Sequence, residues 1–312
     1  MTGNLLCAGL AIASALVTFA NPSGSPERNP VKDEVLAVTS ESYHRLTVPV
    51  TIRGMGPYRF LVDTGAQATV LSLDLANRLE LADRRSATLV GMASTRQVVT
   101  APIDGIELGN RSFNVALAAL VDGANIGGAD GVLGLDSLQN QRVLLDFKHN
   151  VIRVADAKEL GGNAGYEIIV RAKRKLGQLI ITQARLDGVK VSVIVDTGAQ
   201  GSTGNPALLQ RLRHPREIGG ATLTDINGIA LVGAIRETGE LTFDRAKMSN
   251  VPVFFTDSPT FHELGLTQEP ALILGMEELR LFNRVAIDFP SRRVLFDLPL
   301  NDIVTGSLVR AS

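Results

Sequence analysis

The sequence FLVDTGAQ at residues 60–67 returns as VIVDTGAQ at residues 193–200. In both copies three apolar residues precede the aspartate, which is typical of a buried strand that ends at a polar residue. Asp63 and Asp196 are 133 residues apart, about one domain length. One such carboxylate in each half of the chain predicts two aspartates that meet across a pseudo-two-fold axis. Such a pair can share one proton and direct water at an amide carbonyl group.

Composition narrows the functions that the chain can have. Its 312 residues predict roughly two domains, and the hydrophobic content of 45% is ample for sizeable cores. Charged residues make up 20% and the net charge is −1, so we expect no nucleic-acid or polyanion partner. Trp is absent and aromatic residues are only 4%, which disfavours base-stacking platforms. Thirty glycines among short runs of Val, Ile and Thr favour many short strands with tight turns.

Cysteine and histidine give no support for a metal site. Cys7 is the only cysteine, which excludes disulfides, thiol catalysis and cysteine metal clusters from the folded body. No two of the four histidines are spaced as a metal pair on one helix face, so we interpret them as ordinary surface or loop residues. They are His44, His149, His214 and His262. We therefore expect neither a metal nor a cofactor.

The N-terminus predicts export. Residues 5–20 form an almost unbroken apolar run, and Thr18-Phe19-Ala20 is typical of a signal-peptide cleavage site. No Lys or Arg precedes the run, so residues 1–20 are predicted to be a signal peptide or a short N-terminal anchor; a buried N-terminal helix is the alternative. Residues 21–38 are rich in Pro, Ser, Gly and charge and are predicted to be a flexible linker. The expected location is outside the cytoplasm, in the periplasm.

The rest of the chain repeats one order of elements. The predicted domains are a first lobe at 39–160, a second lobe at 161–300 and a tail at 301–312. For the first lobe the patterns predict the following elements: strands at 43–52 and 58–62 around a turn at 54–57, a helix at 73–81, strands at 87–91, 97–108 and 113–120, a glycine-rich loop at 123–130, a short helix from 136 and a hairpin at 142–154. For the second lobe, strands are predicted at 178–186 and 189–195.

Later segments of the two lobes also correspond. Residues 142–147 (RVLLDF) match 284–289 (RVAIDF), and Gly131-Val132-Leu133-Gly134 matches Leu272-Ile273-Leu274-Gly275. The offset between the lobes grows from 133 to 142 residues, so we expect an insertion of about eight residues near 253–268. We interpret the pattern as the duplication of one β-rich lobe.

The pattern resembles aspartic proteases of the retropepsin and pepsin clan over about residues 43–298. Its carriers are the two Asp-Thr-Gly-Ala segments, each paired with a downstream apolar–apolar–Gly element ending at Gly134 or Gly275. Alanine after the glycine resembles retropepsins more than pepsins. The resemblance implies an all-β fold of two pseudo-symmetric acid-protease β-barrel lobes with a shared cleft. Because one chain carries both aspartates, it implies an active monomer.

The resemblance also implies roles for the repeated residues. Asp63 and Asp196 are the expected catalytic pair. The supporting residues are Thr64, Gly65, Ala66, Thr197, Gly198 and Ala199. The threonines would cross-link the lobes through hydroxyl-to-backbone hydrogen bonds, and the glycines would let the backbone approach the carboxylates. Alanines lack a hydroxyl that could stabilise a carboxylate anion, which favours a mildly acidic to neutral working pH.

Two hairpin tips are candidates for flaps that close over a bound peptide. The first is the turn at 91–94, with Gly91 and Met92, and the second lies near Gly228. Plain hairpin turns are the alternative for both. After Asp196 the chain continues as GSTGNP at 201–206, without the apolar pair found at 70–71 after Asp63. We therefore expect a looser floor under the second aspartate.

The favoured function is an aspartic endopeptidase that cleaves exported or membrane-exposed proteins with water activated between two aspartates. Its partner would be a polypeptide substrate in extended conformation, bound as an added strand. A catalytically inactive pseudo-protease that binds peptides is the first alternative. A structural β protein, whose aspartates only cap strands, is the second.

Overall fold

The computed structural model describes residues 4–5, 47–213, 215–299 and 308–310. Apart from Asn4–Leu5, the predicted signal segment and linker lie outside these residues, as do Cys7, His44, His214 and most of the predicted tail. The strand predicted at 43–52 is described from Thr47 onward. In the part of the chain that the structure describes, no helix is both long and apolar enough to cross a membrane.

The first lobe is a closed barrel of six strands. Its strands are β2 (Thr47–Ile52), β3 (Met55–Val62), β4 (Val70–Ser72), β6 (Thr95–Leu108), β7 (Arg111–Val121) and β8 (Gly131–Leu133). The sheet runs in the order β6-β2-β3-β8-β4-β7, and pairing of β6 with β7 closes it. A further strand, β5 (Arg85–Val90), pairs with β6 as a hairpin, and β1 (Asn4–Leu5) pairs with β5 in parallel. Three short helices complete the lobe: α1 (Leu73–Arg78), η1 (Gly123–Ile126) and α2 (Leu135–Leu138).

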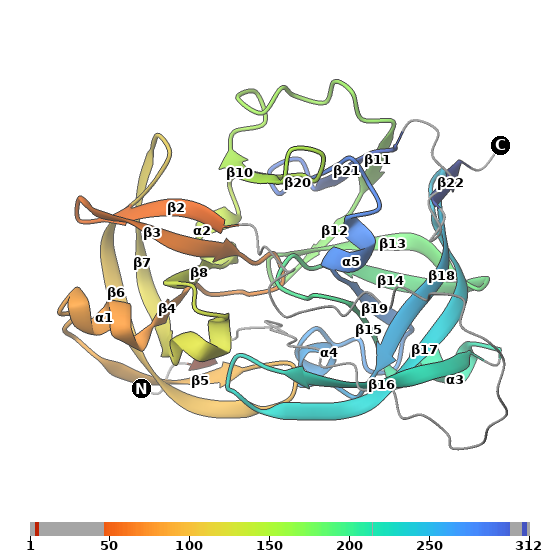
Figure 1. Cartoon of the computed structure of the whole chain (residues 1–312), viewed down its shortest axis with the longest axis horizontal. Helices are drawn as coiled ribbons and strands as arrows, with labels where there is room; N and C mark the ends of the chain where they lie inside the picture. Colours follow the sequence, from red (N-terminus) through yellow and green to blue (C-terminus); the bar gives the residue numbers. More distant parts are fainter. Residues whose placement is uncertain (1–3, 6–46, 214, 300–307, 311–312) are drawn as a thin grey trace, which may run out of the picture.

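The second lobe repeats this barrel (Figure 1). Its strands are β13 (Gln178–Leu186), β14 (Val189–Val195), β15 (Ser202–Gly204), β17 (Ala230–Phe243), β18 (Ala246–Phe255) and β19 (Ala271–Leu274), with β16 (Arg216–Thr224) as the hairpin partner of β17. Pairing of β13 with β17 closes the ring. The additional elements are β12 (Lys173–Lys175), β22 (Leu308–Arg310), α3 (Pro206–Arg211), α4 (Pro259–Glu263) and α5 (Met276–Leu279). The predicted all-β, two-lobed fold is confirmed.

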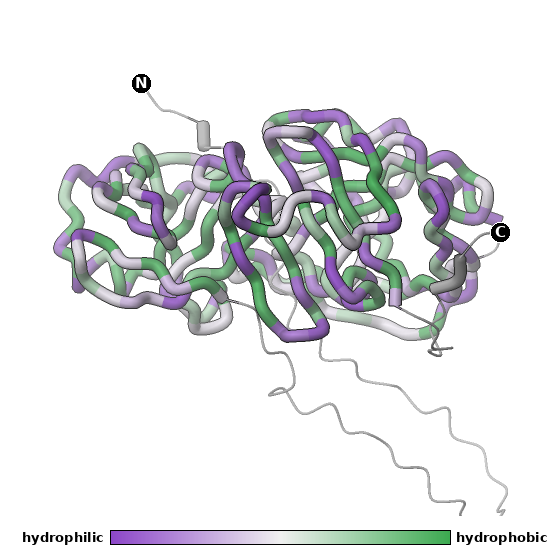
Figure 2. The backbone as a smooth tube through the Cα atoms, turned by 90° about the horizontal axis from the view of Figure 1, so that it is seen from above, coloured by the Kyte–Doolittle hydropathy of each residue, from purple (hydrophilic) through white to green (hydrophobic). Residues whose placement is uncertain are grey.

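Local sequence explains why these elements form. In β2 the side chains of Val48, Val50 and Ile52 are buried on alternate positions, as the apolar alternation predicts for a barrel wall. Ser72 caps α1 by accepting a hydrogen bond from the backbone of Leu75, and Asn205 caps α3 in the same way. Along the tube in Figure 2, apolar and polar segments alternate in both lobes, which is the pattern of short barrel strands joined by polar turns.

One turn differs from the sequence-based expectation, and the expected insertion is found. The turn between the first two strands is shorter than predicted, because Arg53 and Gly54 both adopt positive φ and β3 already begins at Met55. Two successive residues with positive φ form the tight turn that matches the twist of a hairpin. The expected insertion is the segment between β18 and β19, where α4 replaces the short η1 turn of the first lobe.

A five-stranded antiparallel sheet joins the lobes. It has the order β10-β9-β20-β21-β11, with β9 (Arg142–Asp146), β10 (Val151–Ala155), β11 (Ile168–Arg171), β20 (Arg284–Asp288) and β21 (Arg293–Asp297). The central pair β9–β20 takes one strand from each lobe and places Arg142 opposite Asp288. Their side chains form a buried ion pair with Nη2 and Oδ2 2.5 Å apart.

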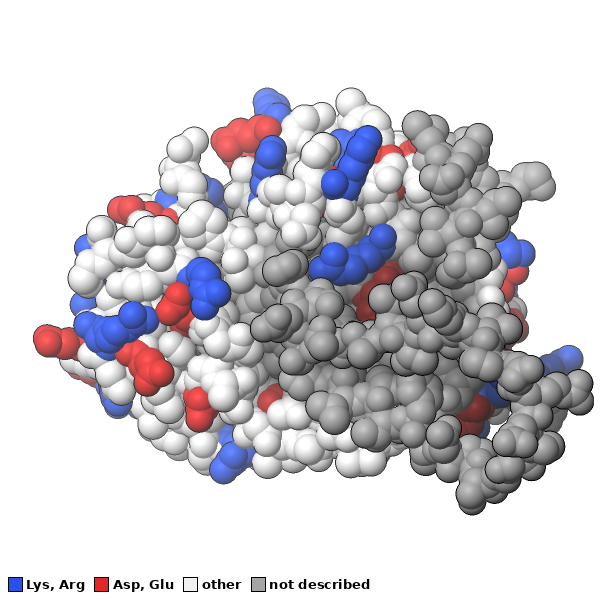
Figure 3. All heavy atoms as spheres, in the orientation of Figure 1, with Lys and Arg blue, Asp and Glu red and all other residues white. Residues whose placement is uncertain are grey.

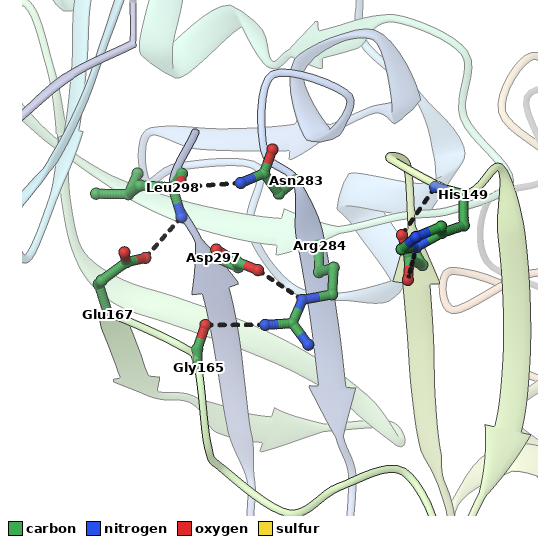
Figure 4. Close-up of polar contacts among 8 residues, drawn as sticks. His149, Gly165, Glu167, Asn283, Arg284, Asp297 and Leu298 are labelled. Carbon is green, nitrogen blue, oxygen red and sulfur yellow. Dashed lines mark hydrogen bonds and ion pairs between the residues drawn. The ribbon is translucent and has the colours of Figure 1, made fainter. Parts of the chain in front are cut away.

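The pseudo-symmetric residues Arg284 and Asp146 form their hydrogen bonds with other partners. Arg284 lies opposite Asp146 in the sheet but bonds instead to Asp297 and to the carbonyl oxygen of Gly165 (Figure 4). Asp146 accepts hydrogen bonds from the backbone and ring of His149. On the outer face drawn in Figure 3, the described acidic and basic side chains are interspersed, in keeping with a net charge of −1.

Candidate active site

Each of the two repeated aspartates stands at the end of a barrel strand that is buried in its lobe. Asp63 follows β3 and Asp196 follows β14. Strand β3 pairs in parallel with β8, which precedes Gly134, and β14 pairs in parallel with β19, which precedes Gly275. The backbone N–H of Asp63 donates to Leu133 at 3.0 Å, and that of Asp196 donates to Leu274 at 3.1 Å. The downstream apolar–apolar–Gly element therefore fixes the backbone of each aspartate.

The inner oxygen of each carboxyl group accepts two backbone hydrogen bonds. Oδ1 of Asp63 accepts from the N–H groups of Gly65 at 2.7 Å and Ala66 at 2.9 Å. In the second lobe, Oδ1 of Asp196 accepts from the equivalent N–H groups of Gly198 and Ala199, at 2.8 and 3.3 Å. These bonds hold both carboxyl groups in one orientation and stabilise their ionised forms.

The structure brings the two carboxyl groups together. The carboxyl group of Asp63 lies against Gly198, that of Asp196 lies against Gly65, and the two residues have exposed fractions of 0% and 1%. A Cβ atom on Gly65 would collide with the carboxyl group of Asp196, and one on Gly198 would collide with that of Asp63. Glycine is therefore required at both positions for the close approach, as predicted from the sequence.

The environment of the pair favours a shared proton. Burial is the main cause that raises the pKa of both groups, well above the ordinary value for Asp63 and to about 6 for Asp196. The charge of Asp196 raises the pKa of Asp63 further. Oδ2 of Asp63 is buried and has no hydrogen-bond partner in the described structure. A proton on Asp63 that is donated to Asp196 satisfies this oxygen, because two ionised carboxylates would offer only acceptors.

The two threonines interlock beneath the aspartates. Oγ1 of Thr64 donates to the carbonyl oxygen of Val195 at 2.8 Å, and Oγ1 of Thr197 donates to that of Val62 at 2.6 Å. Each hydroxyl also accepts the backbone N–H of the other threonine, at 3.1 and 3.2 Å. Each threonine thus bonds to the last strand residue of the opposite lobe, which is the cross-link that the resemblance implied.

The floor of the second lobe is buried and hydrogen-bonded. Strand β15 is buried throughout, and Oγ of Ser202 donates to Glu278 at 2.6 Å and accepts from the backbone of Gly275 at 3.2 Å. Burial raises the pKa of Glu278 to about 8. The first lobe makes the same contact, since Oγ1 of Thr69 donates to Asp136 at 2.7 Å and accepts from the backbone of Gly134 at 3.2 Å. The looser floor expected from the sequence stays a prediction. The pattern gave no sign of Glu278, which lies 76 residues from its partner.

The predicted flap residues lie at two hairpin tips that meet each other (Figure 1). Gly91 and Met92 form the turn between β5 and β6, and Gly228 lies in the turn between β16 and β17. Met92 is 1% exposed and packs in the apolar cluster of the second lobe that includes Ala199. Ile226 is likewise 1% exposed and packs in the cluster of the first lobe that includes Leu61. Each tip therefore covers apolar residues beside the opposite aspartate.

Asp225 joins the two tips. Its Oδ2 accepts from the backbone of Ala93 at 3.2 Å and from the hydroxyl of Ser94 at 2.7 Å, both in the opposite tip. Its Oδ1 accepts from the backbone of Asn227 and Ile229 in its own turn, both at 3.0 Å. Sequence reasoning missed Asp225, although Asp two residues before Asn-Gly is a turn signal that could have marked it.

A second residue that sequence reasoning missed is Gln178. Its side chain is buried and its Nε2 donates to the carbonyl oxygen of Gly65 at 2.5 Å. Among the described residues, no group of three or more His, Cys, Asp or Glu side chains could hold a metal ion.

Comparison with known families identifies both halves of the chain. Residues 48–140 match the family described as "gag-polyprotein putative aspartyl protease", and residues 182–277 match the family described as "Aspartyl protease". Together the two matches span more than half of the chain. A search of curated proteins found no match. With one protease domain in each lobe, the chain belongs to the retropepsin-like aspartic proteases and is an aspartic-type endopeptidase.

Proposed function

We propose that Asp63 and Asp196 act together as a catalytic pair that hydrolyses peptide bonds with one activated water molecule. The observation that carries the proposal is the close approach of two buried carboxyl groups, each lying against a glycine of the opposite lobe at which no side chain fits. Two buried carboxyl groups in such close proximity do not both ionise at neutral pH, so the pair retains one proton.

The proposed reaction uses both protonation states of the pair. The ionised carboxylate removes a proton from water, and the resulting hydroxide attacks the carbonyl carbon of the scissile bond. The protonated carboxyl donates to the carbonyl oxygen as the tetrahedral intermediate forms. When the intermediate collapses, the amide nitrogen takes up a proton from the pair, the carbon–nitrogen bond breaks and the amine leaves. One hydroxyl group of the intermediate returns its proton to the pair as the new carboxyl group forms. The pair ends with one proton, as it began.

The hairpin tips would act as flaps around an extended peptide. Both aspartates are buried beneath tips that contact each other, so the tips must separate before a peptide can reach them. The support for this role is that Met92 packs on apolar residues of the second lobe and Ile226 packs on apolar residues of the first lobe. When the tips move away, these apolar residues become exposed. A peptide with apolar side chains can cover that surface in their place.

The proposed substrates are exported or membrane-exposed proteins, and the proposed location is the periplasm. The support is the apolar segment at 5–20, which is typical of a signal peptide. Cell fractionation together with N-terminal sequencing of the mature protein tests this: recovery in the cytoplasm with an intact Met1 would contradict export.

Activity is tested by incubating the full chain with a denatured protein and following fragments by mass spectrometry, with and without pepstatin. We expect cleavage in the wild type that pepstatin blocks. We expect none in Asp63→Asn or Asp196→Asn, which lose one proton-transfer group each. Peptide binding without fragments would favour the pseudo-protease, and robust cleavage by either variant would refute the shared mechanism.

A further inference from the structure

Gln178 reaches from the second lobe to the loop of the first aspartate. It is the first residue of β13 and follows the tight β12–β13 turn. A Cβ atom on Gly177 in that turn would lie 3.1 Å from the side chains of Leu135 and Gln139, so the turn packs closely on α2 of the first lobe. The backbone N–H group of Leu135 donates a hydrogen bond to the carbonyl oxygen of Ala66 at 2.8 Å. The side-chain amide of Gln178 donates a hydrogen bond to the carbonyl oxygen of the neighbouring Gly65.

The bond from Gln178 acts on one peptide group. The carbonyl of Gly65 and the N–H of Ala66 belong to the same planar unit, so fixing one end of this unit fixes the other. The carbonyl end accepts from Nε2 of Gln178, and the N–H end donates to Oδ1 of Asp63. A donor on the carbonyl oxygen also polarises the unit and strengthens the bond that its N–H makes.

The two aspartate loops differ in the way this arrangement predicts. The N–H of Ala66 lies 2.9 Å from Asp63, whereas the equivalent N–H of Ala199 lies 3.3 Å from Asp196. From the strand registers, the position equivalent to Gln178 in the first lobe is residue 45, which is outside the described residues. The tighter bond belongs to the loop that Gln178 holds.

The remaining polar atom of Gln178 indicates that the residue is not there for packing. Gln178 is 1% exposed, and its Oε1 has no hydrogen-bond partner in the described structure. An apolar side chain of similar size would avoid the cost of burying that oxygen. The ionisable group that contacts Asp63 is Asp196. In the adjacent β12, the side chains of Lys173 and Lys175 are exposed, and Arg174 donates to Gln139.

We propose that Gln178 is a positioning residue for the catalytic pair: it orients the Gly65–Ala66 peptide so that its N–H group holds Asp63. This inference rests on the proposed two-aspartate function. Removing the amide loosens the N–H bond to Asp63, which destabilises the ionised pair relative to the protonated one. The pair then takes up its second proton at a higher pH.

The test is Gln178→Leu, with the carboxyl groups of the pair followed by ¹³C NMR and kcat/KM measured as a function of pH. We expect the lower pKa of the pair, and with it the acid limb of kcat/KM, to rise by about half a pH unit, a roughly threefold change in proton affinity. The matched control is Gln141→Leu, because Gln141 is also buried with an unpartnered Oε1 but donates to Asn140 and Asp156. It should leave both curves unchanged.

A second variant covers the case in which the leucine variant does not fold. In Gln178→Glu the introduced carboxyl can donate to Gly65 only while it is protonated. Its activity relative to wild type should therefore fall as pH rises. Unchanged titration in Gln178→Leu, or a pH-independent activity ratio in Gln178→Glu, overturns the proposal. NMR titration needs no turnover. If the wild type cleaves no peptide but Gln178→Leu still raises the lower pKa of the pair, the proposed function is refuted and this inference stands.

Discussion

Ser94→Ala should speed the entry of peptides into the active site. Ser94 lies in the first hairpin tip, where its hydroxyl donates to Asp225 at 2.7 Å and accepts from Nδ2 of Asn227 at 3.0 Å. The substitution removes the two contacts of the hydroxyl group with the second tip and leaves the bonds of Asp225 within its own turn intact. A hydrogen bond to a charged group contributes about 1.5 kcal/mol at the lower end of its range, which applies to this half-buried hydroxyl.

That loss changes the opening equilibrium by about tenfold. Under the proposed flap role, only the open form admits a peptide, so the observed association rate constant is proportional to the open fraction. Stopped-flow fluorescence with a labelled statine-containing peptide should show association about ten times faster than in wild type. Dissociation should accelerate as well, because the closed complex loses the same contacts.

The matched control is Ser86→Ala in the same hairpin. Ser86 is exposed and its hydroxyl donates to Gln97 within the first lobe, at 3.1 Å. It should associate at the wild-type rate. An unchanged rate in Ser94→Ala, or an equal acceleration in Ser86→Ala, would refute the conclusion that contacts between the tips limit entry.

Three further outcomes are expected. Thr197→Val leaves the buried carbonyl of Val62 and the N–H of Thr64 unpaired, so urea unfolding should show a loss of roughly 2 to 4 kcal/mol; a loss below about 0.5 kcal/mol would contradict the interlock. Folding raises the pKa of Glu278 from 4.5 to about 8, so its contribution to stability is full below pH 4.5 and is lost as pH rises toward 8. In the wild type, the free energy of unfolding from urea titrations should fall by roughly 3 to 5 kcal/mol over that pH range. Glu278→Gln should abolish this fall, whereas Glu277→Gln, at the exposed neighbouring residue, should keep it. Because burial raises both pKa values of the aspartate pair, kcat/KM should peak at mildly acidic to neutral pH, and an optimum near pH 2 would count against this reading.

The fold was predictable because its signals are local and occur twice. Alternating apolar residues, turn glycines and a repeated order of elements are read within short windows of sequence, and both barrels follow them. The close approach at the glycines 65 and 198 was predictable as well, because both lie in the repeated Asp-Thr-Gly-Ala segment, and the structure leaves no room there for a side chain. The same repeat correctly placed the insertion before β19.

The residues that sequence reasoning missed depend on contacts between distant segments. Asp225 bonds to a tip 131 residues away, and Gln178 bonds to a loop 113 residues away. The Asn-Gly signal marks Asp225 as a turn residue, but nothing near it in the sequence shows its contact with the opposite tip. Nothing near Gln178 distinguishes it from an ordinary strand residue. The crossing of Met92 into the second lobe has the same origin. The roles of Met92, Gly91 and Gly228 as flap residues stay predictions.

The most direct test of the shared-proton pair is to titrate the carboxyl carbons of Asp63 and Asp196 by ¹³C NMR in the free wild-type protein. We predict that both signals move in the same two steps, and that the pair still holds one proton at pH values where an isolated aspartate is ionised. Two independent single-step titrations, each near the ordinary value of 3.8, would contradict the account.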